Sequence, residues 1–127
     1  MAFPAAYRYT KEHEWINVQG DTATIGITDH AQESLGDIVF VELPKVGAEV
    51  TAKKSFGTVE SVKAVSDLYA PASGSVTAVN DELTNAPEKI NSDAHGSWMI
   101  KIKLKDAAEV NALMSAADYE KYVAEEK

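Results

Sequence analysis

The lysine with the most unusual surroundings in this chain is Lys63, which lies between Val62 and Ala64 and two positions before Val65. A lysine amine is a weak nucleophile while it carries its proton, so it needs an acyl donor that is already activated. Acylation removes the charge and leaves a long arm on the chain. Exposed apolar neighbours are typical of a surface that another protein recognises. The pattern therefore predicts an amine presented to a modifying enzyme.

Two predicted strands position this lysine, one over residues 55–62 and one over residues 67–70. In this interpretation Glu60 and Ser61 lead into the hairpin, and Lys63–Ala64 form its tip. Two-residue hairpin turns favour Asn and Gly because they require positive φ, and Lys-Ala is a poor choice on that criterion. Either the residue types serve a function, or the turn is longer and looser than two residues. The alternative interpretation of Lys63 is an ordinary solvated surface charge.

The rest of the sequence predicts one mainly β (α+β) domain over residues 1–127, with its core at about 7–105. Alternating apolar and polar residues on both sides of Gly20–Asp21 predict a hairpin, with Val18, Ile25 and Ile27 in the core. The β-branched run before Pro44 predicts another strand, and so do residues 74–80 and 98–104. Short strands separated by glycines favour a flattened barrel or sandwich.

Helices are predicted in two places. Asp29 and Gln32 resemble a capping box and Gly36 favours a helix end, so a short helix is expected over residues 30–35. Two further capping patterns, beginning at Asp106 and Ser115, predict helices over residues 107–114 and 116–124. The turn-rich run from 80 to 97 is expected to be a loop with one helical turn.

A weak internal repeat is also present. The segments from Pro44 and from Pro71 both read Pro-x-x-Gly followed by Val-Thr-Ala. If this repeat is real, it implies two similar β units related by a pseudo-two-fold axis, with Lys63 at the end of the first unit.

The amino-acid composition and the net charge exclude several classes of function. The chain has no cysteine, which excludes disulfides, cysteine-ligated metals and thiol nucleophiles. Its net charge is −8, without a large basic cluster, so nucleic acid and anionic membranes are poor partners. No apolar run approaches the roughly 20 residues of a membrane span. The N-terminal residues predict neither a secretory signal nor a transit peptide.

Other chemical sites are weakly supported. His13 and His30 lack the spacing of paired metal ligands, so no metal site is predicted. The run Ser73-Gly74-Ser75 is not a nucleophile elbow, and the glycines are too scattered for a phosphate loop.

Several motifs carry a family resemblance. The segment ESVKAVSDLYAPASGSV resembles the lipoyl-attachment segment of the glycine cleavage H-protein family. YTKEHEWINVQGDTATIGITDHAQESLGDIVFVELPKVG is similar to the N-terminal half of that family, and INSDAHGSWMIKIKLKD to its closing strand. The resemblance covers residues 7–122. Biotinyl domains carry the lysine between two methionines, and lipoyl domains of 2-oxoacid dehydrogenases usually have Asp-Lys-Ala. Residues 94–98 depart from the family pattern, which has Pro-Tyr and is about one residue longer there.

The resemblance implies a fold of the lipoyl/biotinyl type and a carrier that is not itself an enzyme. Lipoate would be attached to Lys63 as an amide. The implied partners are a PLP-dependent glycine decarboxylase (P protein), a tetrahydrofolate-dependent aminomethyltransferase (T protein), dihydrolipoyl dehydrogenase (L protein), and a lipoate ligase or lipoyl/octanoyl transferase. A monomer is expected, located in a bacterial cytoplasm or, for a processed eukaryotic chain, in the mitochondrial matrix.

The resemblance also implies a surface cleft that shelters the loaded arm. We expect its lining to include a carboxylate that faces the amine of the arm, with these candidates: Glu12, Glu14, Ile27, Leu35 and Asp67. Two alternatives stay open. One is an H-like protein that relays lipoyl groups to other enzymes, and the other is an unmodified β binding module.

Overall fold

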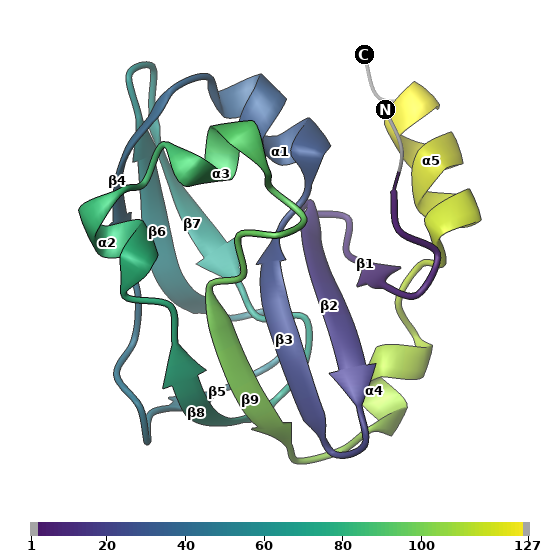
Figure 1. The fold of residues 1–127 in the computed structure, drawn as a ribbon. Helices are drawn as coiled ribbons and strands as arrows, with labels where there is room; N and C mark the ends of the chain where they lie inside the picture. Colours follow the sequence, from purple (N-terminus) through teal and green to yellow (C-terminus); the bar gives the residue numbers. More distant parts are fainter. Residues whose placement is uncertain (1–2, 126–127) are drawn as a thin grey trace.

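The computed structural model describes residues 3–125 and consists of two antiparallel sheets with helices around them (Figure 1). The predicted mainly β fold is confirmed, and within residues 3–125 the sheets do not close into a barrel. The smaller sheet has the order β4 (Ile38–Glu42), β6 (Ser55–Ser61), β7 (Val65–Tyr69). The larger sheet has the order β1 (Arg8–Tyr9), β2 (Glu14–Gln19), β3 (Thr22–Ile27), β9 (Ile100–Leu104), β8 (Gly74–Val79), β5 (Glu49–Val50).

The predicted first hairpin is confirmed. Gln19 pairs with Thr22, which leaves Gly20 and Asp21 as a two-residue turn, and Gly20 has a φ of 67°. Apolar side chains from both sheets form one core, in which Ile25 and Ile27 are buried and Val18 is partly buried. Burial of this apolar surface is the main force that holds the two sheets together.

Helix α1 (Asp29–Leu35) begins one residue before the predicted start. The capping residue is Thr28, whose side chain accepts a hydrogen bond from the Ala31 N–H, so the prediction that Asp29 begins a capping box is wrong. A threonine in extended conformation satisfies an early N–H of the helix as well as an aspartate does. The helix ends at Gly36, which has a φ of 82°.

The loop before β9 contains two single-turn helices, α2 (Glu82–Asn85) and α3 (Lys89–Ser92), where one turn was predicted. Near the C-terminus, α4 (Ala108–Asn111) is shorter than the predicted helix. The Glu109 carboxylate, which the capping pattern would turn back toward this helix, instead accepts hydrogen bonds from the backbone N–H and the hydroxyl of Ser73. The last helix, α5 (Ala116–Glu125), begins as predicted, with the Asp118 N–H donating to Ser115 Oγ.

Helix α5 lies along β1, on the side of the larger sheet away from β6 (Figure 1). Its anchor is Tyr119, which is fully buried and stacks on Tyr9 with ring centroids 4.7 Å apart. None of the helices within residues 3–125 is long and apolar enough to cross a membrane.

The two segments of the internal repeat pair with each other. Val50 lies opposite Gly74 in the β5–β8 register, and the Gly47 N–H donates to the carbonyl oxygen of Val76. The glycine of each segment thus faces the valine of the other, which is the arrangement that a local two-fold axis produces.

Candidate functional site

Lys63 lies in the loop between β6 and β7, which forms a tip at one end of the molecule (Figure 1). The loop has three residues, 62–64, so the predicted two-residue turn is wrong. None of the three is among the described residues with positive φ. The Ser61 hydroxyl oxygen accepts hydrogen bonds from the N–H groups of Lys63, at 3.2 Å, and Ala64, at 3.1 Å. A buried serine thereby fixes the tip without backbone strain.

A second contact fixes the tip to its neighbours. The Val62 N–H donates to the carbonyl oxygen of Asp37, at 3.0 Å, in the segment that links α1 to β4. The stem of the Lys63 side chain passes over Gly36, because a Cβ placed on that glycine would be 3.3 Å from Lys63 Cε. The carbonyl end of α1 carries partial negative charge, which favours a nearby ammonium group. Lys63 is exposed, whereas the backbone of the loop that carries it is held by hydrogen bonds from residues 62, 63 and 64.

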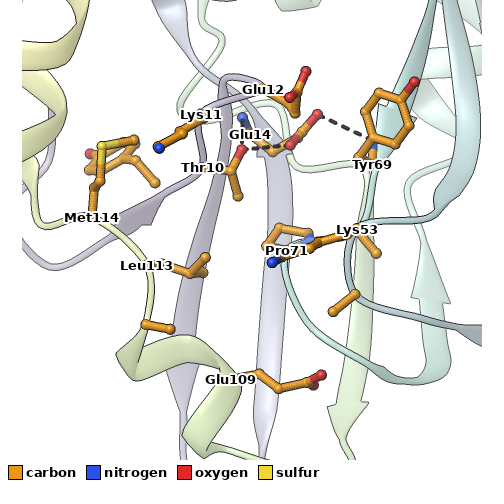
Figure 2. A pocket seen from close by; sticks show the side chains of 14 residues that line it. Thr10, Lys11, Glu12, Glu14, Lys53, Tyr69, Pro71, Glu109, Leu113 and Met114 are labelled. Carbon is orange, nitrogen blue, oxygen red and sulfur yellow. Dashed lines mark hydrogen bonds between the residues drawn. The ribbon is translucent and has the colours of Figure 1, made fainter.

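A groove of about 680 Å³ lies at the end of β7, where Tyr69, Ala70 and Pro71 line it. Residues from separate parts of the chain line it, and Figure 2 labels these ten of the side chains that it draws: Thr10, Lys11, Glu12, Glu14, Lys53, Tyr69, Pro71, Glu109, Leu113 and Met114. The wall carries three carboxylates and two lysine amines on a mostly apolar surface.

Glu14 is the buried acid of this groove, with only 2% of its surface exposed. The Thr10 hydroxyl donates to Oε1 at 2.6 Å, and the Tyr69 N–H donates to Oε2 at 3.2 Å (Figure 2). Burial raises the pKa of Glu14 to about 7, although these two hydrogen bonds act in the opposite direction, and the charge of Glu12 raises it further. A carboxyl group with such a pKa ionises readily when a cation comes near it.

Of the five cleft candidates, the structure brings Glu12 and Glu14 together in the groove. Asp67 is exposed on β7, two residues before Tyr69. Ile27 is buried in the core and Leu35 packs against it, so neither lines the groove.

Three of the groove residues, Thr10, Lys53 and Tyr69, were not predicted from the sequence. Thr10 and Tyr69 are needed because they hold the Glu14 carboxylate. Lys53 reaches the groove from a turn in which it has a φ of 70°. A positive φ at a lysine has no sequence signal, whereas the Thr10 pairing was accessible in principle, since a threonine four residues before a glutamate can bond to it locally.

Strand β7 connects the tip to the groove. Val65, Asp67 and Tyr69 alternate with Ser66 and Leu68, so the first three share one face of the strand. At the usual rise per residue, the distance along the strand from Ala64 to Tyr69 is about 17 Å. An arm that starts at Lys63 and follows this face passes Asp67 before it reaches the groove.

The loop at residues 94–97, where the sequence departs from the family pattern, closes against α1. The Asp29 N–H donates to Nε2 of His95 at 3.2 Å, and the Trp15 indole donates to the carbonyl oxygen of Ala94. Burial lowers the pKa of His95, against the opposing charges of Asp29 and Asp93. His95 thus serves as a neutral acceptor for the first turn of α1.

His13 and His30, whose spacing does not fit a metal site, contact each other, and His13 also contacts the last helix. His13 and His30 lie with ring centroids 4.7 Å apart, and His13 Nδ1 is 2.7 Å from the Tyr119 hydroxyl. Within the described part of the chain, no three His, Asp or Glu side chains are grouped as ligands for a metal ion.

Comparison with known proteins identifies the family of this chain. The sequence profile described as "Glycine cleavage H-protein" matches residues 7–126. The chain is a member of the glycine cleavage H-protein family. The glycine cleavage system H protein of Acidobacterium capsulatum is 68% identical over 126 residues, covering 99% of this chain and 98% of the relative. The H protein of Koribacter versatilis has the same identity and coverage.

The fold agrees with this membership. A crystal structure of the glycine cleavage system H protein from Mycobacterium marinum superposes with a TM-score of 0.87 at 41% sequence identity, over 94% of this chain and 97% of the other. The family assignment and the fold confirm the role predicted from the sequence, a lipoyl carrier in glycine cleavage.

Proposed function

We propose that Lys63 is the residue on which this H protein carries its lipoyl group, as an amide of the side-chain amine. The observation that carries the proposal is the geometry of the tip. The amine is exposed on a three-residue loop, and the buried Ser61 hydroxyl fixes the backbone on both sides of it. A rigid base and a free end are what an enzyme needs to find one lysine among many.

The remaining residues fit such a group. When attached, a lipoyl group supplies a disulfide that thiol chemistry opens and re-forms. The chain has no cysteine, so it offers no thiol of its own for exchange with that disulfide. The groove begins at Tyr69, which shares one face of β7 with Val65 and Asp67, and its wall is mostly apolar.

The proposed role is that of a carrier subunit rather than an enzyme. Lys63 would hold the arm while it visits glycine decarboxylase, then the aminomethyltransferase, and finally dihydrolipoyl dehydrogenase. Sequential visits require complexes that dissociate quickly, which suits polar and charged contacts. A net charge of −8 is compatible with such contacts.

Modification of Lys63 is tested by intact mass. Incubation with a lipoate ligase, lipoate and ATP should add one lipoyl group, on the peptide that contains Lys63. Lys63→Arg should gain no mass, whereas the control Lys54→Arg, at another exposed lysine, should be modified normally. An unmodified wild-type chain, or lipoylation that persists in Lys63→Arg, would contradict the proposal. A glycine–bicarbonate exchange assay with the decarboxylase then separates a carrier for glycine cleavage from a lipoyl relay.

We propose further that the groove shelters the loaded arm, with Glu14 facing the cationic amine at its end. Glu14 is the buried carboxyl group of the groove, and Asp67 lies on the way to it. Glu14→Ala should shorten the lifetime of the loaded arm the most, and Asp67→Ala to a smaller degree. If both variants release the one-carbon unit at the wild-type rate, this assignment is wrong.

A further inference from the structure

The outer face of the smaller sheet carries a row of side chains next to the tip. In the β4–β6–β7 register, Phe40 pairs with Glu60, and Glu60 pairs with Val65. Directly paired residues in antiparallel strands place their side chains on the same face. The neighbouring pair Val41–Val59 points into the core, so the Phe40–Glu60–Val65 row points away from it. We call this row, together with Val62 of the loop, the tip face.

The apolar members of the tip face are unusually exposed. Val62 and Val65 each have 67% of their surface exposed, and Phe40 has 48%. Scattered exposed apolar residues need no explanation, but here one lies in the loop with Lys63 and two lie in the row behind it. A bulge in β4 between Ile38 and Phe40 also leaves Val39 half exposed beside the row.

Apart from the neighbouring Lys63, the charged side chains on this side of the smaller sheet are acidic. Glu60 is exposed within the row, and the next row on the same face contains Glu42 and Asp67 at its two edges. A partner that covers this face therefore needs an apolar centre with basic groups around it.

The length of the unmodified side chain limits which partner can need this face. Before acylation, the Lys63 amine ends only four methylene groups from its backbone, and that stem passes over Gly36. An enzyme that acylates the amine must therefore approach the tip closely enough to contact the residues around it. Enzymes that act later, at the end of a lipoyl arm, reach their target much farther from the tip.

We propose that the tip face is the docking surface for the enzyme that attaches lipoate to Lys63, and that this enzyme meets it with an apolar patch bordered by Lys or Arg. This inference rests on the proposed lipoylation of Lys63 and adds its recognition determinants. Phe40 is far from Lys63 in sequence, and only the strand register brings it into the row. Val65 and Phe40 supply apolar contact, and Glu60 between them supplies the charge.

The test measures kcat/KM for lipoylation of purified variants by a lipoate ligase, with lipoate and ATP and with mass as the readout. Val65→Asp and Phe40→Asp should each lower kcat/KM by about tenfold, mainly through KM. Val46→Asp is the matched control, because Val46 is 65% exposed but lies in the β4–β5 connection. It should stay within about twofold of wild type, as expected for a change away from the interface.

Charge is tested separately. Glu60→Lys should lower kcat/KM and weaken its dependence on salt, since an attraction becomes a repulsion. Glu120→Lys, at an exposed glutamate of α5, makes the same change of charge far from the tip and should leave both quantities unchanged. Circular dichroism of each variant verifies that it is folded, and Val65→Thr, which keeps the branched shape, replaces Val65→Asp if that variant unfolds.

The outcomes separate the two proposals. Normal kcat/KM in Val65→Asp, Phe40→Asp and Glu60→Lys would overturn the docking surface while leaving Lys63 as the attachment site. Absence of lipoylation in the wild-type chain would instead overturn the proposed function. A loss as large in Val46→Asp as in Val65→Asp would show a general effect of the substitution and would also overturn the docking surface.

Discussion

The hairpin tip and the groove present opposite environments to two ionisable groups. Lys63 is exposed at the end of a loop, and its backbone is fixed by neighbours while its side chain is left in water. Glu14 is buried, and both of its carboxylate oxygens accept hydrogen bonds from residues outside β2. The tip thus keeps its charged group solvated, whereas the groove holds a carboxyl group that is costly to ionise.

The difference fits the functions that we propose for the two regions. A residue that is to be modified must be reached by an enzyme, so burial would defeat it. A residue that receives a cation gains from being dry, because the attraction between opposite charges is stronger where water is excluded. The groove therefore carries an electrostatic cost in the empty protein, and the tip does not.

The largest expected effect on the free energy of unfolding comes from ionisation of Glu14. Its pKa is raised from 4.5 to about 7, so between these values the folded protein holds a proton that the unfolded chain has released. This contribution to stability is fully present below about pH 4.5 and is lost as pH rises through 7. At pH 8 the buried carboxylate costs about 3 kcal/mol, which Glu14→Gln should remove.

Urea unfolding at pH 5 and pH 8 measures this effect. The wild-type chain should lose more free energy of unfolding between the two pH values than Glu14→Gln does, and the difference between the two proteins should begin to appear above about pH 4.5. Asp67→Asn removes an exposed carboxylate on the proposed route of the arm and is the control, with a change within about 0.5 kcal/mol. Equal pH dependence in the wild type and Glu14→Gln would mean that the groove acid is not costly to ionise.

The same contrast explains what the sequence could reveal. Lys63 can be singled out as a candidate from the sequence because its neighbours in sequence are also its neighbours in space, as at any hairpin tip. The groove was predicted only in part, because its wall combines β2, the turn at Lys53, the end of β7 and helix α4. Of the two residues that hold Glu14, Thr10 lies only four positions before it in the sequence, whereas Tyr69 is brought close only by packing across the molecule.

The turn at the tip shows a second limit. Lys-Ala looked ill-suited because a two-residue turn needs positive φ, but Ser61 allows a three-residue loop that needs none. A serine hydroxyl that caps a loop is compatible with many sequences, so the loop length was not readable from residue types. The same ambiguity shifted the start of α1, where Thr28 and Asp29 are both good capping residues.

An intermediate effect is expected at Ser61. Ser61→Ala removes the oxygen that accepts the N–H groups of Lys63 and Ala64, and should lower the free energy of unfolding by about 1–2 kcal/mol. It should also slow lipoylation, because the base of the lysine is no longer held. Ser66→Ala, on the neighbouring strand, makes the same change without disturbing the loop and should be close to neutral in both assays. Equal behaviour of the two variants would show that the tip does not depend on the serine hydroxyl.

The smallest effect is expected at Lys63 itself. Lys63→Gln should change the free energy of unfolding by no more than about 0.5 kcal/mol, because the amine is exposed and the loop is held through backbone groups. Urea unfolding at low and at moderate salt measures this change. A loss near 1 kcal/mol that disappears with salt would mean that the carbonyl end of α1 holds the ammonium group in place. A neutral result would mean that the folded protein makes no structural use of this charge, which leaves the amine available for acylation.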